Sequence, residues 1–466
     1  MKIVIFGVGK FYKNRKDELE KYLGEKDEIV SFLDNSVTDN IEYLGGIRIL
    51  NPANITSLDY DKIVIMSSYE KEMREQLISL NCTNYNIWSW ERFISEMSHG
   101  RFIHYGNALK TNSNKNVLII SADLGYNGGT IAAVYAAKAI QSKENRVILA
   151  ARSGDPKFID ETVNAGVCVT ISPAIPYLGE EELEWVNQFD VVIVNTFQMI
   201  KCACMISMIK PTLWWIHEPV CYYEDTLSKF PQYRDKDCIK RINIQGVSRL
   251  PQKNFNAIFP ETVKKTMPYG IPDDGVCDFS ITAKLSFAIV GSVIKTKAQD
   301  IFAKAVNLLD DSLDASFWIV GSICEDEYCN QVRQLIKDDN RFKIWGNCTR
   351  EQMKEIYKEI DVVVCPSRED SLPIVMTEGM MYGKVCIVSE AAGTADFIED
   401  GVNGLICKAG DEHSLALKMQ WVIDHTDKLG DMGKNARKTY EENFTMEKFA
   451  QRLEHVINET IEAYEE

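Results

Sequence analysis

Two acidic residues, Asp370 and Glu378, are separated by seven residues in a stretch whose pattern changes from strand to helix. The apolar run DVVVC (361–365) predicts a buried strand, and the polar residues SREDS follow it. We expect a helix from about Pro373 to Gly383, because proline suits a first helical turn and glycine a C-terminal cap. Asp370 is thus expected in the loop before the helix, and Glu378 about a turn and a half inside it.

The start of that helix is a candidate anion site. Free backbone amides and the positive end of the helix dipole favour a diphosphate or a sugar near Ser371 and Leu372. Glu378 is placed to accept hydrogen bonds from two vicinal hydroxyls, such as those of a ribose. Spacing alone, however, favours a solvated loop containing Glu369 and Asp370 plus one surface glutamate. The interpretation therefore depends on the surrounding sequence.

Strands alternate with helical patterns nearly throughout the 466 residues, which predicts parallel sheets covered by helices. The length is that of two or three domains. In such sheets ligands bind beyond the carboxyl ends of the strands. The expected strands include KIVIFG, IVSFLDN, DKIVIMSS, NVLIISA, RVILAA, CVTISP, DVVIVNT, TLWWIHE, NIQGVS, LSFAIVGS, ASFWIVG, FKIWG, DVVVCPS and KVCIVS.

Composition narrows the class of protein. A formal charge of −16 argues against nucleic-acid binding, which needs a concentrated basic face. The sequence has no pattern of a signal peptide, and the apolar stretch 191–209 is interrupted by polar residues, so a strand and a helix are expected there. Thirteen scattered cysteines predict reduced thiols and a cytoplasmic protein. Cys202 and Cys204 are interpreted as buried thiols, and no cluster with metal-ligand spacing is found.

PSREDSLPIVMTEGMMYG (366–383) resembles family 4 of the glycosyltransferases, retaining enzymes of the GT-B fold with a stretch like PSxxEGFGLPxLEAMAxG. The resemblance implies that Glu378 binds the nucleotide ribose and that residues 370–372 bind the sugar and diphosphate. Asp370 stands where the family has its first glutamate. Because Glu369 is adjacent, either of the two acids could contact the donor sugar.

A second matching stretch, GSVIKTKAQD (291–300), looks like the family segment that supplies a lysine to the diphosphate. The resemblance gives this role to Lys297, with Lys295 as a second candidate. An ammonium there would stabilise negative charge on the leaving group. Ser292 replaces the usual arginine of the family, so one cationic contact is missing or comes from elsewhere.

Two predicted strand ends, WIVGS and KIWGN, match those lining the family's nucleotide pocket. They contribute Gly321 and the run Trp345, Gly346 and Asn347, which could flank the base; a core tryptophan explains Trp345 equally well. AAGTADFIEDGVNGLI (391–406) resembles another family stretch, with an aspartate in place of a glutamate, and is assigned mainly to packing.

On the acceptor side, Gly128 and Gly129 follow a strand and open a helix, where family 4 enzymes have a glycine pair near the diphosphate. His217 ends another strand, and the family has a histidine in this region facing the donor sugar. A structural role for His217 is equally consistent with the sequence, and Glu218 is a weaker candidate. The aromatic and cationic segment 221–241 could meet an acceptor or anionic lipid, or be a solvated loop.

The first hundred residues carry part of a dinucleotide-binding pattern. Gly7 and Gly9 follow the first strand and Asp34 ends the second, but Tyr12 occupies the third glycine position. The segment resembles small Rossmann-like units of bacterial surface-polysaccharide enzymes, some of which bind nucleotide sugars. We favour an accessory domain that contacts a protein partner, or a second copy of the chain, over an NAD site.

The expected fold class is α/β, with two doubly wound Rossmann-like domains facing a cleft (GT-B) and a small Rossmann-like domain before them. The expected divisions are an accessory domain, a linker, an acceptor-side domain, a nucleotide-sugar domain, and a C-terminal helix that returns to the acceptor-side domain: 1–97, 98–115, 116–272, 273–440 and 441–466.

The resemblance implies a metal-independent retaining glycosyltransferase, of the hexosyl or N-acetylhexosaminyl type. Its co-substrate would be a UDP- or GDP-linked sugar, with no other cofactor, and its acceptor a glycan, a lipid-linked glycan or a protein. Bacterial surface-glycan assembly in the cytoplasm, with peripheral contact at the inner membrane face, is expected. Two alternatives stay open: a GT-B partner protein with a degenerate site, and an NAD-binding oxidoreductase or epimerase acting through residues 1–97.

Overall fold

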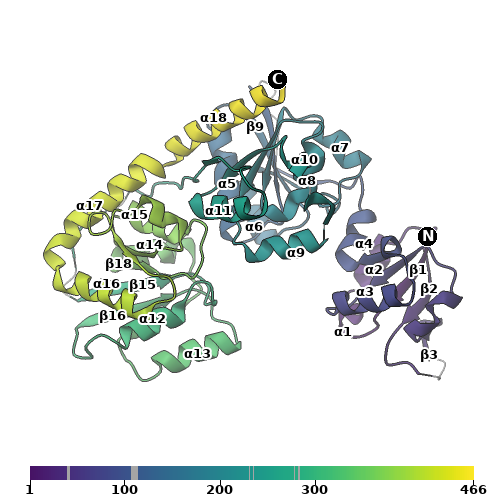
Figure 1. The fold of residues 1–466 in the computed structure, drawn as a ribbon, viewed down its shortest axis with the longest axis horizontal. Coiled ribbons are helices and arrows are strands. Elements are labelled where there is room, and N and C mark those ends of the chain that lie inside the picture. Colours follow the sequence, from purple (N-terminus) through teal and green to yellow (C-terminus); the bar gives the residue numbers. More distant parts are fainter. Residues whose placement is uncertain are drawn as a thin grey trace. The chain divides into compact units, whose positions relative to one another are not determined.

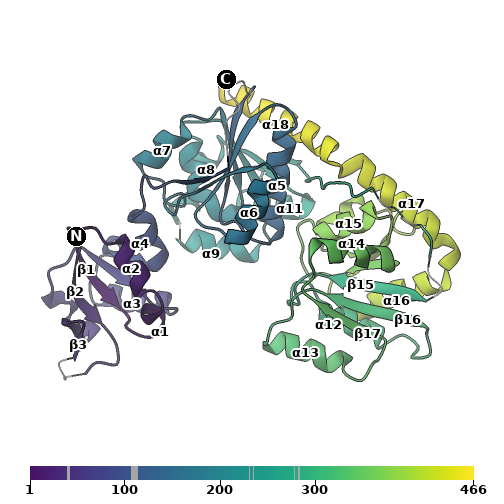
Figure 2. The same cartoon turned by 180° about the vertical axis from the view of Figure 1, so that it is seen from behind.

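The computed structural model describes residues 1–38, 42–106, 114–229, 231–234, 236–275, 277, 279–281 and 284–465. They form two compact units, each described by itself. One comprises Met1–Ile103, Ala151–Ser153 and Ile171–Val186, and the other His104–Ala150, Gly154–Thr170 and Asn187–Glu466. Within the described residues the strands form three main sheets, shown from opposite sides in Figures 1 and 2.

The N-terminal sheet has the strand order β3-β4-β2-β1-β5-β6, with β3 antiparallel to β4 and the other pairs parallel. Its strands are β1 (Lys2–Phe6), β2 (Glu28–Leu33), β3 (Glu42–Leu44), β4 (Ile47–Leu50), β5 (Lys62–Ile65) and β6 (Ile87–Ser89). Its helices are α1 (Lys10–Lys13), α2 (Lys16–Tyr22), η1 (Pro52–Ser57), α3 (Glu70–Ser79), η2 (Asn84–Asn86) and α4 (Trp90–Glu96).

Alternation along β1 builds a core on each face of this sheet. Ile3 and Ile5 pack with residues of α2 and α4, whereas Val4 and Phe6 pack with residues of α3. Tyr12, in the third glycine position, packs edge-on against Phe32 with ring centroids 5.4 Å apart. The helix after β1 therefore has a half-buried aromatic residue packed against the core and only four residues, unlike a dinucleotide-binding helix.

The middle sheet has the order β14-β13-β12-β11-β8-β9-β10-β7. Its strands are β7 (Ile103–Tyr105), β8 (Asn116–Ser121), β9 (Arg146–Ala151), β10 (Cys168–Ile171), β11 (Val191–Asn195), β12 (Thr212–Ile216), β13 (Asn243–Gly246) and β14 (Lys265–Thr266). The helices that follow its strands along the chain are α5 (Gly128–Gln141), α6 (Pro156–Asn164), α7 (Glu180–Val186), η3 (Phe197–Met199), α8 (Ile200–Ile206), α9 (Cys221–Lys229), η4 (Pro231–Arg234), α10 (Lys236–Ile239) and α11 (Arg249–Ile258). The expected linker, 98–115, thus contributes an edge strand, and part of it lies outside the described residues.

The C-terminal sheet is wholly parallel, in the doubly wound order β17-β16-β15-β18-β19-β20. Its strands are β15 (Leu285–Val290), β16 (Ala315–Val320), β17 (Phe342–Gly346), β18 (Val362–Cys365), β19 (Val385–Ser389) and β20 (Leu405–Cys407). Figures 1 and 2 show α12 (Gln299–Val306) and α13 (Glu327–Ile336) on one face, and α14 (Arg350–Glu359) and α15 (Ile374–Met381) on the other. The short η5 (Gly393–Phe397) follows β19.

Local sequence explains where several of these helices begin. Asn127 caps α5 by accepting from the Thr130 amide at 2.9 Å, and a reciprocal capping box of Thr349 and Gln352 opens α14. Pro373 is the N-cap of α15, so the helix begins one residue later than the sequence suggested.

Three helices complete the fold: α16 (Glu412–Asp424), α17 (Thr426–Asn443) and α18 (Met446–Glu465). The last of them, yellow in Figure 1, packs against α5, β11 and β12 of the middle sheet. α5 is rich in buried alanines, which allow another helix to approach closely.

Candidate active site

Lys297 and Asp370 meet at the carboxyl ends of two adjacent strands. Lys297 lies in the loop after β15 and Asp370 in the loop after β18, and Nζ donates to Oδ2 at 2.5 Å. Burial alone would lower the pKa of Lys297, but the Asp370 carboxylate outweighs burial and raises it. The lysine is therefore an ammonium at neutral pH, half-buried and held at the point where the sequence analysis expected a diphosphate.

The two acids left open by the sequence have different partners. Asp370 contacts Lys297, whereas Glu369 Oε1 accepts from the Val220 amide at 3.2 Å and from Asn254 Nδ2 at 2.8 Å. Asp370 is thus the acid paired with the candidate phosphate lysine. Glu369 instead joins the loop to residues of the 116–272 segment.

The next two residues of the loop are held through their carbonyl groups. The Ser371 carbonyl accepts from Ser248 Oγ and the Leu372 carbonyl from the Tyr269 hydroxyl, each at 2.5 Å. The Ser371 hydroxyl is buried and has no hydrogen-bond partner among the described residues. The loop backbone is therefore fixed while one hydroxyl beside Asp370 keeps its hydrogen-bonding capacity.

Glu378 projects from α15 into an arrangement that the sequence analysis did not foresee. Its Oε1 accepts from Arg350 Nη1 and its Oε2 from the Tyr357 hydroxyl at 2.8 Å, with the carboxylate 7% exposed. A buried carboxylate needs such partners, and here a cation and a phenol supply them. Tyr357 stacks on Tyr382 with ring centroids 4.8 Å apart, which fixes the phenol.

Three further candidates, Gly321, Ser292 and Lys295, lie in or beside the loop that carries Lys297. Gly321 follows β16 with φ of +145°, and a Cβ there would lie 2.1 Å from the Gly291 carbonyl oxygen, so only glycine fits. Ser292 accepts from the Ser322 hydroxyl at 2.9 Å, a neutral contact where the family has a cation. Lys295 is exposed, and its carbonyl accepts from Arg368 Nη1 at 2.7 Å.

The candidate base-flanking residues lie on the edge strand β17. Trp345 packs on Trp318 with ring centroids 5.2 Å apart, and Lys343 Nζ lies 3.9 Å from the Trp345 centroid. Gly346 follows with φ of +67° and its carbonyl accepts from the Gly321 amide at 2.9 Å, while Asn347 is exposed. Trp345 is therefore part of an aromatic and cationic cluster at the sheet edge.

Gly128 and Gly129 are the first two residues of α5, beyond the carboxyl end of β8. A Cβ on Gly128 would meet nothing within 4 Å, so this glycine leaves open space in front of the helix. The Gly129 carbonyl accepts from Asn195 Nδ2 at 3.1 Å, which links the helix start to the end of β11. Both glycines thus lie at an accessible helix N-terminus, and their role in donor binding stays a prediction.

His217 and Glu218 follow β12, and burial shifts the pKa of each from its ordinary value. The His217 ring packs edge-on against Trp215 at 4.3 Å between centroids, its Nε2 has no partner among the described residues, and burial lowers its pKa to about 3. Burial raises the pKa of Glu218 to about 7, although its oxygens accept from the Phe197 amide at 2.8 Å and the His217 amide at 3.1 Å. His217 is a neutral imidazole at pH 7, able to donate or accept but not to act as a cation.

Several residues of this site were missed from the sequence: Arg350, Tyr357, Asp300 and Arg368. The sequence does contain one sign that Arg350 has an acidic partner. A cation in the first turn of a helix interacts unfavourably with the helix dipole, and a nearby anion offsets this. The others have no comparable pattern, because their partners are distant in the chain.

Outside this region, the described residues contain one group that could hold a metal ion: His99, Glu181 and Glu182. Glu182 is fully buried and already accepts from His99 Nδ1 at 2.6 Å and from the Gly100 and Gly179 amides at 2.9 and 2.8 Å. These hydrogen bonds explain why the three side chains lie together without a metal ion: Glu182 joins the segment around His99 to the start of α7.

The N-terminal sheet has a cavity of about 310 Å³ beyond β1, β2 and β5, lined by Gly7, Gly9 and Asp34 among others. Asp34 accepts from the Val8 amide there at 3.1 Å, so the acid holds the glycine turn. None of the helices in the described part of the chain has the length and hydropathy needed to cross a bilayer.

Comparisons with known proteins match two parts of the chain. Residues 281–439 match the family model "Glycosyl transferases group 1", and residues 1–88 match "C2185-like, N-terminal". N-acetyl-alpha-D-glucosaminyl L-malate synthase of Bacillus anthracis is 26% identical over 171 residues, covering 35% of this chain and 42% of that protein.

A second curated relative comes from Campylobacter jejuni, the N,N'-diacetylbacillosaminyl-diphospho-undecaprenol alpha-1,3-N-acetylgalactosaminyltransferase. It is 23% identical over 208 residues, covering 44% of this chain and 52% of that protein. The chain spans about half the length of the curated relatives it matches.

Solved structures extend the likeness over more of the chain. Anabaena HepE in complex with UDP and glucose superimposes with a TM-score of 0.63 at 16% identity, covering 74% of this chain and 100% of that chain. Sucrose-phosphate synthase from Thermosynechococcus elongatus gives a TM-score of 0.59 at 15% identity, covering 74% and 99%. Residues 281–439 therefore match the glycosyl transferases group 1 model, within a chain that has the GT-B fold.

Proposed function

We propose that this protein transfers a glycosyl group from a nucleotide diphosphate sugar to an acceptor hydroxyl, with retention of the anomeric configuration. The observation that carries the proposal is the Lys297–Asp370 contact at the carboxyl ends of β15 and β18, inside the matched domain. An ammonium has three donors, so Lys297 can keep Asp370 and still bind a phosphate oxygen.

The proposed division of labour follows the positions of the side chains. Lys297 and the start of α15 hold the diphosphate, Asp370 and Ser371 meet the donor sugar, and Glu378 accepts from the ribose hydroxyls. Ribose binding requires Arg350 to share or release Glu378, because both carboxylate oxygens are engaged. Gly128 and Gly129 leave space for the diphosphate at the start of α5.

In the proposed reaction the leaving phosphate accepts the proton of the acceptor hydroxyl on the same face of the sugar. No metal ion is then needed, since Lys297 and helix amides stabilise the charge that develops. Neutral His217 hydrogen-bonds the donor sugar or the leaving group, which suits an imidazole whose pKa is about 3.

The substrate class is inferred from the relatives. HepE is seen with UDP, and the Campylobacter relative is named for N-acetylgalactosaminyl transfer to a lipid-linked sugar. We therefore propose a UDP-linked hexose or N-acetylhexosamine as donor, with GDP sugars as the second choice. A glycan or lipid-linked glycan of a bacterial surface polymer is the proposed acceptor.

A screen of UDP- and GDP-sugars for donor hydrolysis, with EDTA present throughout, tests the proposal. One sugar is expected to be hydrolysed slowly and to raise the melting temperature, and Glu378→Ala is expected to remove both effects. Proton NMR of a transferred product reports retention. No hydrolysis and no stabilisation by any nucleotide sugar would support the alternative of a partner protein with a degenerate site.

A further inference from the structure

The loop that carries Lys297 has an unusual backbone. Gly291 opens it with φ of +137°, and Ala298 closes it with φ of +63°, a left-handed conformation that alanine rarely adopts. Lys297 lies between these two turns, and its amide donates to the Ile294 carbonyl at 3.0 Å. Such a loop needs outside contacts to keep one conformation.

Arg368 supplies those contacts from the loop after the neighbouring strand β18. Its Nη1 donates to the Lys295 carbonyl at 2.7 Å, and its backbone amide donates to the Thr296 carbonyl at 2.8 Å. The two residues that precede Lys297 are therefore both bound by a single residue, which lies two positions before Asp370.

Asp300 in turn fixes the guanidinium. Arg368 Nη1 and Nη2 donate to its two oxygens at 2.8 and 2.7 Å, and the Tyr328 hydroxyl donates at 2.7 Å. Burial alone would raise the pKa of Asp300, but the bonds from Arg368 and Tyr328 outweigh it and lower the pKa, so the acid stays ionised. Only a planar, two-pronged cation can bind this carboxylate and the Lys295 carbonyl together.

We infer that Arg368 is a positioning residue, which holds residues 295 and 296 so that the Lys297 ammonium stays at Asp370 and at the donor diphosphate. This inference rests on the proposed function, because it concerns how Lys297 is presented. Arg368 itself does not bind the donor. Its guanidinium binds the Lys295 carbonyl and Asp300, and so acts on the donor only through the loop that carries Lys297.

A positioning role predicts a loss restricted to the diphosphate. We would measure binding of UDP and UMP (GDP and GMP if the donor is a GDP-sugar) to the full chain by calorimetry. Arg368→Ala is expected to weaken UDP binding about tenfold or more, as Lys297→Ala does, and to change UMP binding less than about twofold. The double variant should bind UDP no more weakly than Lys297→Ala, because both changes remove the same contact.

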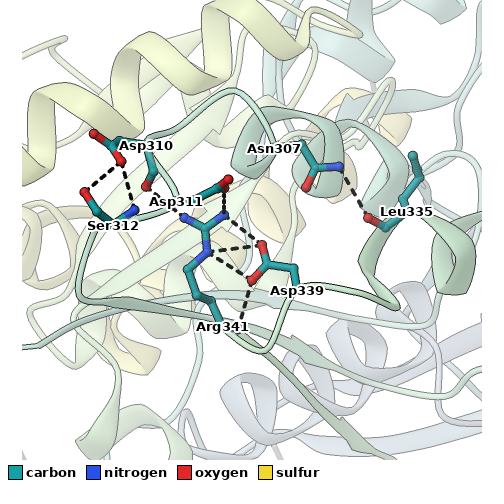
Figure 3. A network of polar contacts seen from close by, with 7 residues as sticks. All are labelled: Asn307, Asp310, Asp311, Ser312, Leu335, Asp339 and Arg341. Atoms are coloured by element: carbon teal, nitrogen blue, oxygen red, sulfur yellow. Dashed lines mark hydrogen bonds and ion pairs between the residues drawn. The ribbon is translucent and has the colours of Figure 1, made fainter.

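Arg341→Ala is the matched control, since Arg341 also binds an aspartate with two prongs and a backbone carbonyl in the same domain (Figure 3). It should change neither UDP nor UMP affinity once the folded fraction is taken into account. Arg368→Lys, which keeps the charge and is the gentler change for folding, should restore only part of the lost UDP affinity.

The outcomes distinguish the proposed role of Lys297 from the positioning role of Arg368. If Lys297→Ala binds UDP normally, the proposed function of Lys297 is wrong. If Lys297→Ala loses UDP and both Arg368 variants keep it, or lose UMP equally, only the positioning role is overturned.

A separate observation concerns two thiols of the middle sheet. Cys204 on α8 is buried, Cys238 on α10 is half-buried, and their sulfur atoms lie 3.0 Å apart. That distance exceeds a disulfide bond by about 1 Å. Burial raises the pKa of the Cys204 thiol, so the more exposed Cys238 is the sulfur that an oxidant reaches first.

We propose that Cys204 and Cys238 form a reversible disulfide under peroxide stress. Hydrogen peroxide oxidises one thiol to a sulfenic acid with release of water. The second thiol then displaces hydroxide, so that two thiols and one peroxide yield one disulfide and two waters. The bond would close a chain loop that contains His217 and Glu218 and would join α10 to α8, which restrains the segment 221–241 that contains α10.

Mild peroxide treatment of the native protein, followed by non-reducing peptide mapping, tests this. The expected result is one linkage between the peptides containing Cys204 and Cys238, reversed by dithiothreitol, formed in Cys202→Ser and abolished in Cys238→Ser. A linkage of Cys204 or Cys238 to a different cysteine, or treated protein in which the Cys204–Cys238 linkage does not form, would overturn the proposal.

Discussion

Two arginines lie near opposite strand ends of the C-terminal sheet, and each binds the same kinds of group: an aspartate carboxylate and a backbone carbonyl. Arg341, just before β17, binds Asp339, Asp311 and the Asp310 carbonyl, and so joins the loops before β16 and β17 (Figure 3). Arg368, after β18, binds one aspartate and the carbonyl of a loop residue beside Lys297. The chemistry is shared, and the position differs.

The position decides what each arginine can do. The amino ends of parallel strands lie away from the ligand-binding edge, so the contacts of Arg341 contribute stability. The carboxyl ends present backbone and side chains to a ligand, so the same contacts at Arg368 also set the geometry of a site. We therefore expect an ion pair at the amino ends of the strands to affect stability alone, and one at the carboxyl ends to affect ligand binding as well.

The largest effect is expected at Lys297, the residue that distinguishes the carboxyl edge. Lys297→Ala should lower donor turnover by about 10²–10³-fold, because a preorganised charge on the leaving group is lost, with little change in melting temperature. Lys418→Ala is the control, since Lys418 is similarly exposed and binds Asp400 at 2.8 Å. Equal turnover in both variants would break the comparison.

Gly321 should give the next largest effect, because it supports the carboxyl end of β16. Gly321→Ala places a methyl group 2.1 Å from the Gly291 carbonyl oxygen at a φ of +145°, and should cost about 2–4 kcal/mol of stability. Gly346→Ala, at φ of +67° with nothing within 4 Å of the added carbon, should cost about 1 kcal/mol. Thermal unfolding of both variants checks the order.

A smaller effect is expected at the amino edge. Arg341→Ala should destabilise the protein by about 2 kcal/mol, since it leaves Asp339 and the Asp310 carbonyl without their cation, while turnover per folded molecule stays at the wild-type value. Melting temperature and a turnover assay on soluble protein measure the two quantities. A loss of turnover with unchanged stability would reverse the roles of the two edges.

The smallest effect is a pH dependence of that same variant. The Arg341 guanidinium holds the pKa of Asp339 below its usual 3.8, so the pair stabilises the folded state above that pH and the stabilisation is lost as pH falls. The melting-temperature deficit of Arg341→Ala should therefore be full at pH 7 and shrink toward pH 3. A constant deficit would mean that packing, and not charge, accounts for the effect.

Much of the doubly wound core could be predicted because its strands are apolar on both faces. Runs such as VVVC and VCIVS are buried from end to end, and such runs are visible without a structure. The missed strands are short, and all of them except β4 lie at the edge of a sheet; β7, for example, has three exposed residues. A strand with neither length nor an apolar face has no pattern of its own.

The sequence predicted the individual loops of the candidate site but not the contacts between loops. Lys297 and Asp370 were each placed at a strand end, and their contact follows from the adjacency of β15 and β18, which lie far apart in the sequence. The partners of Glu378 could not be inferred, because Arg350 and Tyr357 belong to a separate helix whose side-chain directions depend on its packing. Their roles, and those of the other site residues, stay predictions.

The packing of α18 on α5 also has a consequence for synthesis. A ribosome completes α5, β11 and β12 long before it adds residues 446–465, which contact these three elements. The alanine-rich helix α5 therefore stays uncovered by α18 while residues 273–440 are translated, and is exposed to chaperones or to neighbouring nascent chains. Premature termination before α18 should yield aggregates, even though the residues of the candidate donor site would already be present.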